Sequence, residues 1–317
     1  MQRVEINRDL DAAKPLLEAT AEVPVGSTKR CEGIMKRTML LLLCIQFTAF
    51  TLTRATFRSR MCDAQIMGMS EVIKGGVAAS MSFRRRTEWF VGIGSTLVPV
   101  VCFVIMNLLS LWAMRHLSAG ASTVLMQMKL PMTVWWSRVL LGKRVSFVGL
   151  LLVMLIVDGS IGIAVGETDM FVVNSGSRRA SATAAFALTC ETFLSGFAVS
   201  YMELLFCTSH MWVRNVQMSC ASLVLYGIWV SINTDSCNVW RVDVEGGALA
   251  TLGAAGGLLV ALTLKHVGAT EKTMVVMASV VLTSVVEAFL RWEAPSLHFV
   301  THAICVLISV YAYAHAK

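Results

Sequence analysis

The sequence predicts an all-α fold, a polytopic membrane bundle of ten transmembrane helices arranged as a 5+5 inverted repeat. Composition is the first observation behind this prediction, because 56% of the 317 residues are hydrophobic and only 15% are charged. A soluble domain normally carries about 25% charged residues. The second observation is a series of ten apolar stretches, each close to the roughly 20 residues that cross a bilayer as a helix. Most of the core is therefore expected to consist of helices in lipid.

The ten apolar stretches follow one another with short connections. They cover roughly residues 37–56, 62–81, 89–114, 119–141, 145–166, 181–207, 212–233, 245–265, 272–291 and 296–315. The second stretch is the weakest because Asp63, Glu71 and Lys74 interrupt it. Short connections predict antiparallel neighbours and leave no room for an inserted soluble domain.

Residues 1–36 differ from the rest of the chain. They are polar, carry charges of both signs and show no sustained apolar period, which predicts a disordered tail ahead of a membrane domain over residues 37–317. Lys and Arg are in excess on the side of the N-terminus, so both termini are expected in the cytosol. The basic residues are scattered between apolar runs without a basic-aromatic patch, and no nucleic-acid partner is expected.

Lys129 is the most informative residue of the chain. It lies in the fourth stretch, which is apolar apart from Gln127, Lys129 and Arg138. A charge at mid-membrane depth costs about 2.5–3.5 kcal/mol or more, so it usually faces an internal cavity. Pro131 weakens the helix just beyond it, as is tolerated where a helix lines a cavity. A cation halfway across a membrane indicates an anion that passes through.

An internal repeat follows from the number of spans. Five spans per half would invert the second half relative to the first, which is the logic of many transporters with a site at the midplane. Each half has a lysine in or near its fourth span, Lys129 in the fourth stretch and Lys272 at the start of the ninth. The two halves share no visible sequence identity, so the prediction depends on span count and lysine placement.

Five segments, in order, carry a family resemblance. They are Ser70–Lys74 (SEVIK), Gln127–Pro131 (QMKLP), Ser195–Ala198 (SGFA) followed by Tyr201 and Glu203, Trp212–Gln217 (WVRNVQ), and Gly256–Lys265 followed by Lys272. On these motifs the chain resembles nucleotide-sugar transporters of the drug/metabolite transporter superfamily. The resemblance is to the branch that carries CMP-sialic acid, UDP-galactose and UDP-N-acetylglucosamine. It covers residues 37 to 315 and implies a ten-helix transporter domain over residues 37–317.

The resemblance implies a phosphate site at two lysines. Lys129 and Lys272 would bracket a diphosphate or phosphodiester, because ammonium groups bind phosphate oxygens as point charges. The alternative for Lys272 is an ordinary lysine at the cytosolic end of a helix.

Polar side chains in apolar runs supply candidates for nucleotide binding. Asn107, Gln127, Asn215 and Gln217 are amides, which read a nucleobase edge well because they both donate and accept. The resemblance places Asn107 and Asn215 near the nucleotide and Ser219 near the base. The alternative for all of them is hydrogen bonding between helices.

Five charged residues are assigned to a gate or to structural ion pairs. Glu71 and Lys74 are three residues apart and can pair on one helix face. Arg214 and Glu203 are expected near the cytosolic surface, where a gate or a structural salt bridge explains both, and the structural interpretation is preferred. Lys265 stands beside His266, which indicates a solvated helix end and leaves a substrate role as the alternative.

No cofactor and no metal are expected. His298 and His302 have the i, i+4 spacing of metal ligands but no fixed third partner. Glu287 is an intramembrane carboxylate with Arg291 one turn further on, so a local ion pair is the alternative to a functional role. A membrane enzyme should show a carboxylate or a histidine pair beside Lys129, and none is expected there.

The predicted function is exchange. A nucleotide-sugar, with UDP-galactose or UDP-N-acetylglucosamine favoured, would enter the Golgi lumen from the cytosol while a nucleoside monophosphate leaves. Uridine is favoured because Met106 and Ser122 depart from the sialic acid pattern. The alternatives are a CMP-sialic acid transporter, an exporter of another small organic anion, and a non-transporting membrane scaffold. The expected partners are the two nucleotides and the lipid bilayer, with a homodimer as an option. The Golgi membrane is the expected location and the ER membrane the alternative.

Overall fold

The computed structural model describes residues 26–56, 61–114, 116–117, 119–166, 178–232, 243–292 and 296–315. It divides into two units, residues 1–38 and 39–317. Of the first unit only residues 26–38, the beginning of one helix, are described. The architecture and the site below belong to the second unit.

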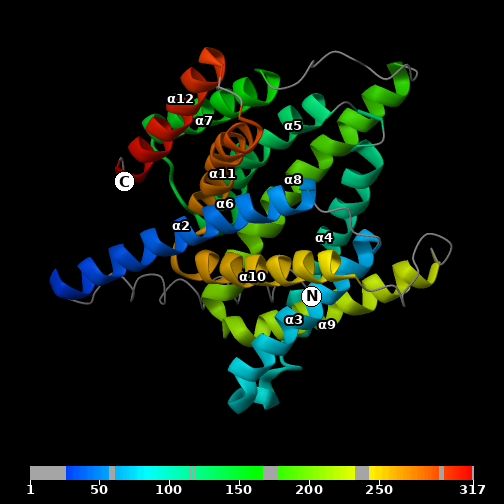
Figure 1. Ribbon diagram of the computed structural model, residues 1–317. Coiled ribbons are helices and arrows are strands. Elements are labelled where there is room, and N and C mark those ends of the chain that lie inside the picture. The colour runs from blue at the N-terminus through cyan, green and yellow to red at the C-terminus, as the bar shows by residue number, and fades with distance from the viewer. Residues whose placement is uncertain are drawn as a thin grey trace. The chain divides into compact units, whose positions relative to one another are not determined.

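The described residues form helices, with no strand among them (Figure 1). The helices are α2 (Gly26–Thr56), α3 (Asp63–Ser82), the 3₁₀ helix η1 (Phe83–Glu88), α4 (Ile93–Met114), α5 (Ala119–Gln127), α6 (Lys129–Leu141), α7 (Phe147–Gly166), α8 (Arg178–Thr208), α9 (Met211–Ile232), α10 (Val244–His266), α11 (Ala269–Arg291) and α12 (Leu297–His315). Each of the ten predicted stretches coincides with a helical segment, and α5 and α6 together form the fourth. The all-α prediction is therefore confirmed.

Half of these helices have the length and composition of membrane spans. Within the described residues, six are long and apolar enough to cross a bilayer, in α2, α8, α9, α10, α11 and α12. Two shorter apolar stretches, Ile93–Met106 and Phe147–Ile163, lie in α4 and α7. The second and fourth predicted spans fall short for a physical reason, because charges interrupt α3 and a break divides α5 from α6. The chain is a membrane protein with several apolar helices.

The first helix begins earlier than the apolar pattern predicted. α2 begins at Gly26, so it includes residues 26–36, which the sequence assigned to the polar tail. Residues 1–25 lie outside the described part of the chain, and a disordered tail there stays a prediction.

The fourth span is broken next to Lys129. α5 ends at Gln127 and α6 begins at Lys129, with Met128 between them. Pro131 explains the break, because proline has no N–H to donate to the carbonyl of Gln127 four residues earlier and its ring crowds that carbonyl. The predicted weakening of this helix is thus a real interruption, and it places Lys129 at the beginning of the second half-helix.

Local sequence signals define the neighbouring helix ends. Gly142 ends α6 in the left-handed region at φ 65°, which glycine adopts without strain. Asp243 caps α10 by accepting a hydrogen bond from the Gly246 N–H at 2.6 Å. Gly268, at φ 122°, precedes α11 and turns the chain sharply out of α10.

Helices from the two halves of the chain pack together. α3 contacts α9 and α10, α7 lies along α12, and α8 contacts both α4 and α6. One buried apolar cluster joins α6, α7, α11 and α12 around Leu130, Ile156 and Val306. A second joins α4, α8, α9, α10 and α11 around Phe206 and Leu264. The pairing of the second span with the seventh and of the fifth with the tenth fits an inverted repeat, which stays a prediction.

Candidate functional site

Lys129 forms an ion pair with a carboxylate on another helix. Its Nζ lies 2.9 Å from Oε1 of Glu191 on α8. The Glu191 side chain is 4% exposed, whereas that of Lys129 is 26% exposed. The lysine therefore keeps an accessible flank while the carboxylate is enclosed by protein.

Glu191 corrects the expectation that no carboxylate would lie beside Lys129. It falls near the middle of the apolar segment Ala182–Thr208. The signal was present in the sequence, because a carboxylate inside a predicted span is a functional candidate by default. Its pairing could not be read from spacing, since the two residues lie on separate helices.

Lys272, the other predicted phosphate lysine, lies in the first turn of α11. It is partly buried, and its ammonium group stands 5.9 Å from the centre of the Phe47 ring, within the range of a cation–π contact. Lys129 is near enough for the charges of the two lysines to interact unfavourably. That the two lysines bind an anion together stays a prediction.

Small side chains bring α6 and α8 into close contact beyond the Lys129–Glu191 pair. A Cβ atom on Gly196 would lie 2.7 Å from the backbone carbonyl carbon of Met132, so only glycine fits there. One turn further on, the Ser200 hydroxyl lies 3.2 Å from that of Ser137. The SGFA motif thus serves helix packing, and it fixes the relative positions of Lys129 and Glu191.

A second Lys–Glu pair lies at the other end of the contact between α6 and α8. Glu203 on α8 accepts a hydrogen bond from Lys143, which follows α6, on Oε1. Its Oε2 accepts a hydrogen bond from the Ala269 N–H at 2.7 Å, at the first residue of α11. A negative charge is favourable at a helix N-terminus, so Glu203 ties α8 to two neighbouring segments. The sequence had grouped Glu203 with Arg214 and missed Lys143.

Glu71 and Lys74 form the predicted pair within α3. Their side chains approach to 2.6 Å and are 17% and 11% exposed. Gly257 on α10 leaves room for the Lys74 stem, since a Cβ there would lie 3.0 Å from Lys74 Cδ. This packing against α10 favours the structural interpretation of the pair.

Arg214 and Gln217 share a hydrogen-bond network with the segment that precedes α4. The Gln217 Nε2 donates to the carbonyls of Trp89 and Val91, and its Oε1 accepts from Thr96 and Arg214. Its amide thus uses its full hydrogen-bonding capacity within the protein. Hydrogen bonding between helices, the alternative stated for the amides, describes Gln217 in this structure.

Arg214 also binds the chain reversal before α4. Its guanidinium donates to the Gly92 carbonyl at 2.6 Å and to the Ser209 hydroxyl at 2.8 Å. These contacts hold α9 against the α3–α4 connection, in line with the preferred structural role.

The other predicted nucleotide-binding residues differ in how far the protein satisfies them. Asn215 donates to the Met211 carbonyl at 3.0 Å within α9. The Gln127 Oε1 and the Ser219 Oγ are buried and find no hydrogen-bond partner among the described residues. Ser219 packs against Gly75 of α3. The Asn107 side chain lies outside the described residues.

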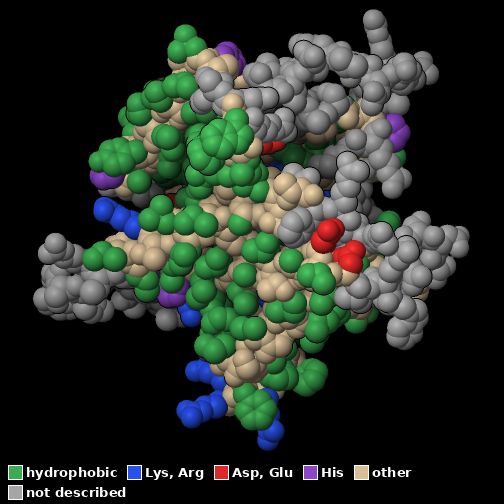
Figure 2. Space-filling model, viewed as in Figure 1, with side chains coloured by type: hydrophobic (Ala, Val, Ile, Leu, Met, Phe, Trp, Pro, Cys, Tyr) green, Lys and Arg blue, Asp and Glu red, His purple; other side chains and the backbone are tan. Residues whose placement is uncertain are grey.

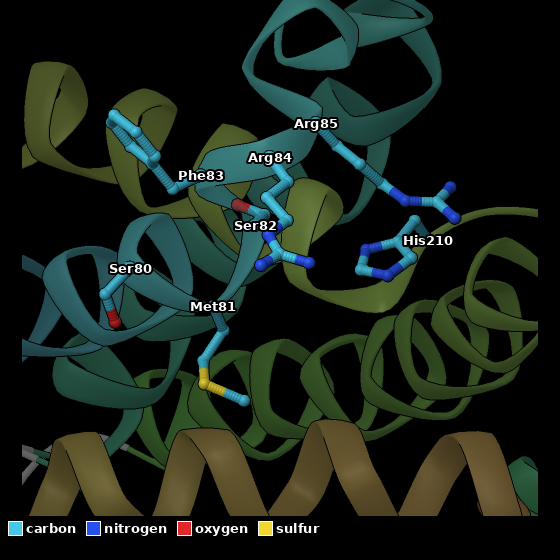
Figure 3. A pocket seen from close by; sticks show the side chains of 7 residues that line it. All are labelled: Ser80, Met81, Ser82, Phe83, Arg84, Arg85 and His210. Carbon is cyan, nitrogen blue, oxygen red and sulfur yellow. The ribbon is translucent and has the colours of Figure 1, made fainter.

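Lys265 is exposed in the last turn of α10, which agrees with a solvated helix end. A pocket of about 470 Å³ lies at η1, and Arg84, Arg85 and His210 are among the residues that line it (Figure 3). Burial, together with the charges of Arg85 and Lys265, lowers the pKa of His210 below its ordinary value, while Glu88 opposes the shift. The pocket is an open, basic surface and contains none of the predicted phosphate or nucleotide residues.

Metal-binding geometry is not found in the described residues, where no three His, Cys, Asp or Glu side chains gather. His302 instead bonds the His298 carbonyl at 2.8 Å through Nδ1. Glu287 is partly buried on α11, and the side chain of Arg291 lies outside the described part.

Comparison with known proteins agrees with this architecture. The family model described as nucleotide-sugar transporter matches residues 32–314. Two similar proteins are from Caenorhabditis elegans. The UDP-galactose/UDP-N-acetylglucosamine transporter srf-3 is 24% identical over 97% of this chain and 93% of its own length. The UDP-galactose translocator 1 is 22% identical over 98% of each chain.

A third relative and a solved structure extend the likeness. The UDP-N-acetylglucosamine/UDP-N-acetylgalactosamine transporter nstp-4, also from Caenorhabditis elegans, is 26% identical over 69% of this chain and 68% of its own. A protein crystal structure superposes with a TM-score of 0.72 at 12% identity, covering 88% of this chain and 96% of that chain. At such low identity the superposition shows the fold alone.

Proposed function

Because the chain belongs to the nucleotide-sugar transporter family, we propose that it carries a UDP-sugar from the cytosol into the Golgi lumen in exchange for UMP. Nucleotide-sugar transport is the activity of the family, and the chain is not an enzyme. The sugar nucleotide, the direction of transport and the exchange are the parts that this proposal adds.

One observation carries the proposal: Lys129, in a stretch predicted to cross the membrane, lies at the break between two half-helices with 26% of its side chain accessible. Interrupted helices at the midplane are the usual place of substrate sites in transporters. Lys272 adds a second positive charge in range of the first. Together they can bind the phosphates that a nucleotide-sugar and a nucleoside monophosphate have in common.

Uridine is proposed as the base on two grounds. The names of the three relatives all specify UDP-sugars or UDP-galactose. Met106 and Ser122 also depart from the sialic acid pattern, and both side chains are buried. Among the predicted amides, Gln127 is the best candidate to contact the nucleotide, because its carbonyl oxygen is unpaired within the described residues and it adjoins the helix break.

The proposed orientation places both termini in the cytosol. Arg84, Arg85 and Arg86 are exposed on η1, and Figure 2 shows a basic group of side chains at the end of the molecule where η1 lies in Figure 1. Positive residues favour the cytosolic side of a membrane. That end would therefore face the cytosol, where the nucleotide-sugar enters.

The test combines a binding panel with transport. The purified protein should gain thermal stability with UMP and UDP-sugars, less with CMP, and none with free galactose or inorganic phosphate. In proteoliposomes, uptake of UDP-galactose or UDP-N-acetylglucosamine should be faster into vesicles loaded with UMP than into empty ones. Equal stabilisation by inorganic phosphate would instead favour an exporter of another organic anion. No response to any nucleotide, with intact fold, would refute the proposed function.

A further inference from the structure

The phosphate site contains a carboxylate that nucleotide binding would not require. Lys129 and Lys272 contribute two positive charges, and Glu191 contributes a negative charge 2.9 Å from one of them. An anionic substrate must therefore approach a cation that already has an anionic partner.

The protein holds Glu191 by fewer contacts than its burial would lead one to expect. Its Oε1 pairs with Lys129, but its buried Oε2 accepts no hydrogen bond from the described residues. The large majority of buried side-chain polar atoms have at least one hydrogen-bond partner. Glu203, on the same helix, meets that standard with Lys143 and the Ala269 N–H. Lys129 is thus the main attachment of Glu191, and a stronger anion can compete for it.

We propose that Glu191 is the internal counter-anion of the phosphate site, which occupies Lys129 in the ligand-free carrier and competes with the nucleotide phosphate for it. This inference rests on the proposed function. Acting through Lys129, Glu191 sets the affinity for the substrate and the degree to which uptake depends on a nucleotide inside the vesicle.

Two consequences follow from the charges. The first concerns affinity, because phosphate must share or replace an existing charge-assisted contact and therefore binds less tightly than it would to Lys129 alone. The second concerns the empty carrier. An unpaired lysine is costly to move through the membrane, whereas a Lys129–Glu191 pair moves as a neutral unit. The wild-type carrier should therefore reorient without a nucleotide at a measurable rate.

A merely structural Glu191 predicts a different outcome. Removing its charge would then lower thermal stability, with and without UMP, and leave the affinity for UMP and the ratio of loaded to empty uptake unchanged. The two roles are distinguished by these last quantities and not by stability.

The experiment compares Glu191→Gln with wild type and with Glu71→Gln as a matched control. Glu71 is also a carboxylate paired with a lysine, at 2.6 Å, but that pair lies within α3. Titration of the full-length protein with UMP should give a Kd about tenfold lower for Glu191→Gln, the order expected when one charge-assisted contact no longer competes. Uptake into empty vesicles should fall while uptake into UMP-loaded vesicles persists, so that their ratio rises several-fold. Glu71→Gln should leave the Kd and the ratio unchanged.

An unchanged or weaker affinity of Glu191→Gln for UMP would overturn the inference. If that variant does not fold, Glu191→Asp tests the same point, because its charge is one methylene further from Lys129. It should shift the Kd in the same direction by a smaller factor, and a wild-type Kd would refute the proposal. If wild type itself neither binds UMP nor transports a UDP-sugar, the proposed function fails instead.

Discussion

Two Lys–Glu pairs join α8 to other parts of the chain, one to Lys129 in the fourth span and one to Lys143 just after it. The two pairs differ in what else each carboxylate binds. Glu191 and Glu203 are separated by about 18 Å along α8 at 1.5 Å per residue. Glu203 is bonded on both oxygens, to Lys143 and to the first N–H of α11. Glu191, inside the apolar segment Ala182–Thr208, is bonded on one oxygen only among the described residues. The same residue types in one interface thus make a structural tie at one end and a replaceable contact at the other.

The largest effect is expected from Lys129→Ala. Uptake should fall about a hundredfold, because a charged contact to phosphate contributes about 1.5–3 kcal/mol. Stability should fall as well, since the variant leaves the enclosed Glu191 carboxylate without its cation. Proteoliposome uptake and a thermal melt measure the two effects.

The double variant Lys129→Ala/Glu191→Gln serves as the control for that prediction. It should recover most of the stability and none of the uptake. Recovery of uptake would mean that Lys129 acts only as a partner of Glu191.

Removing the Glu203 carboxylate should lower stability and leave UMP binding nearly unchanged. Glu203→Ala is expected to destabilise the protein by about 2–4 kcal/mol, since it leaves Lys143 and the Ala269 N–H without their acceptor. The Kd for UMP should stay within about twofold of wild type. Thermal melts and UMP titration of the folded fraction measure both. Glu88→Ala, which removes an exposed pair with Arg85, should change the melt little. A large loss of UMP affinity in Glu203→Ala would remove the distinction between the two pairs.

The close contact between α6 and α8 can be perturbed without touching a charge. Gly196→Ala would bring a methyl group to 2.7 Å from the Met132 backbone and should cost about 1–3 kcal/mol. Gly227→Ala on α9 is the matched control, because nothing lies within 4 Å of its added Cβ. Equal melting temperatures for the two variants would show that the helices do not approach as described.

The smallest effects are expected from replacing two amide side chains, Gln217 and Gln127, which are predicted to have different roles. Gln217→Ala should cost about 1–2 kcal/mol by breaking the network with Thr96 and Arg214, with similar losses of affinity for UMP and CMP. Gln127→Ala should leave the melt nearly unchanged and weaken UMP binding. If Gln217→Ala instead weakened UMP binding without lowering the melting temperature, and Gln127→Ala lowered it, Gln217 would be the amide that recognises the base.

Much of the fold followed from local signals in the sequence. Apolar runs located the ten helical segments, and Pro131 indicated the weakness at which the fourth span is interrupted. These features depend on one stretch of chain at a time. The start of α2, at Gly26, extended furthest beyond what hydropathy marked, and the 3₁₀ helix η1 lies between two marked stretches.

The site was less predictable because its pairings join distant helices. Lys129 stands out as a charge in an apolar run, and Glu71 with Lys74 follows from helical spacing. Neither rule assigns Glu191 to Lys129 or Lys143 to Glu203, since those contacts depend on how α8 packs against α6. The fully satisfied amide of Gln217 likewise depends on carbonyls that precede α4.

The most direct test of the difference between the two Lys–Glu pairs is the preference for UMP over uridine. It is measured by competition binding to Lys129→Gln and Lys143→Gln. The two variants remove the same charge from the two pairs. We predict that Lys129→Gln binds UMP no better than uridine, whereas Lys143→Gln keeps the wild-type preference for the phosphate. A Lys129→Gln protein that still prefers UMP as strongly as wild type would contradict the account.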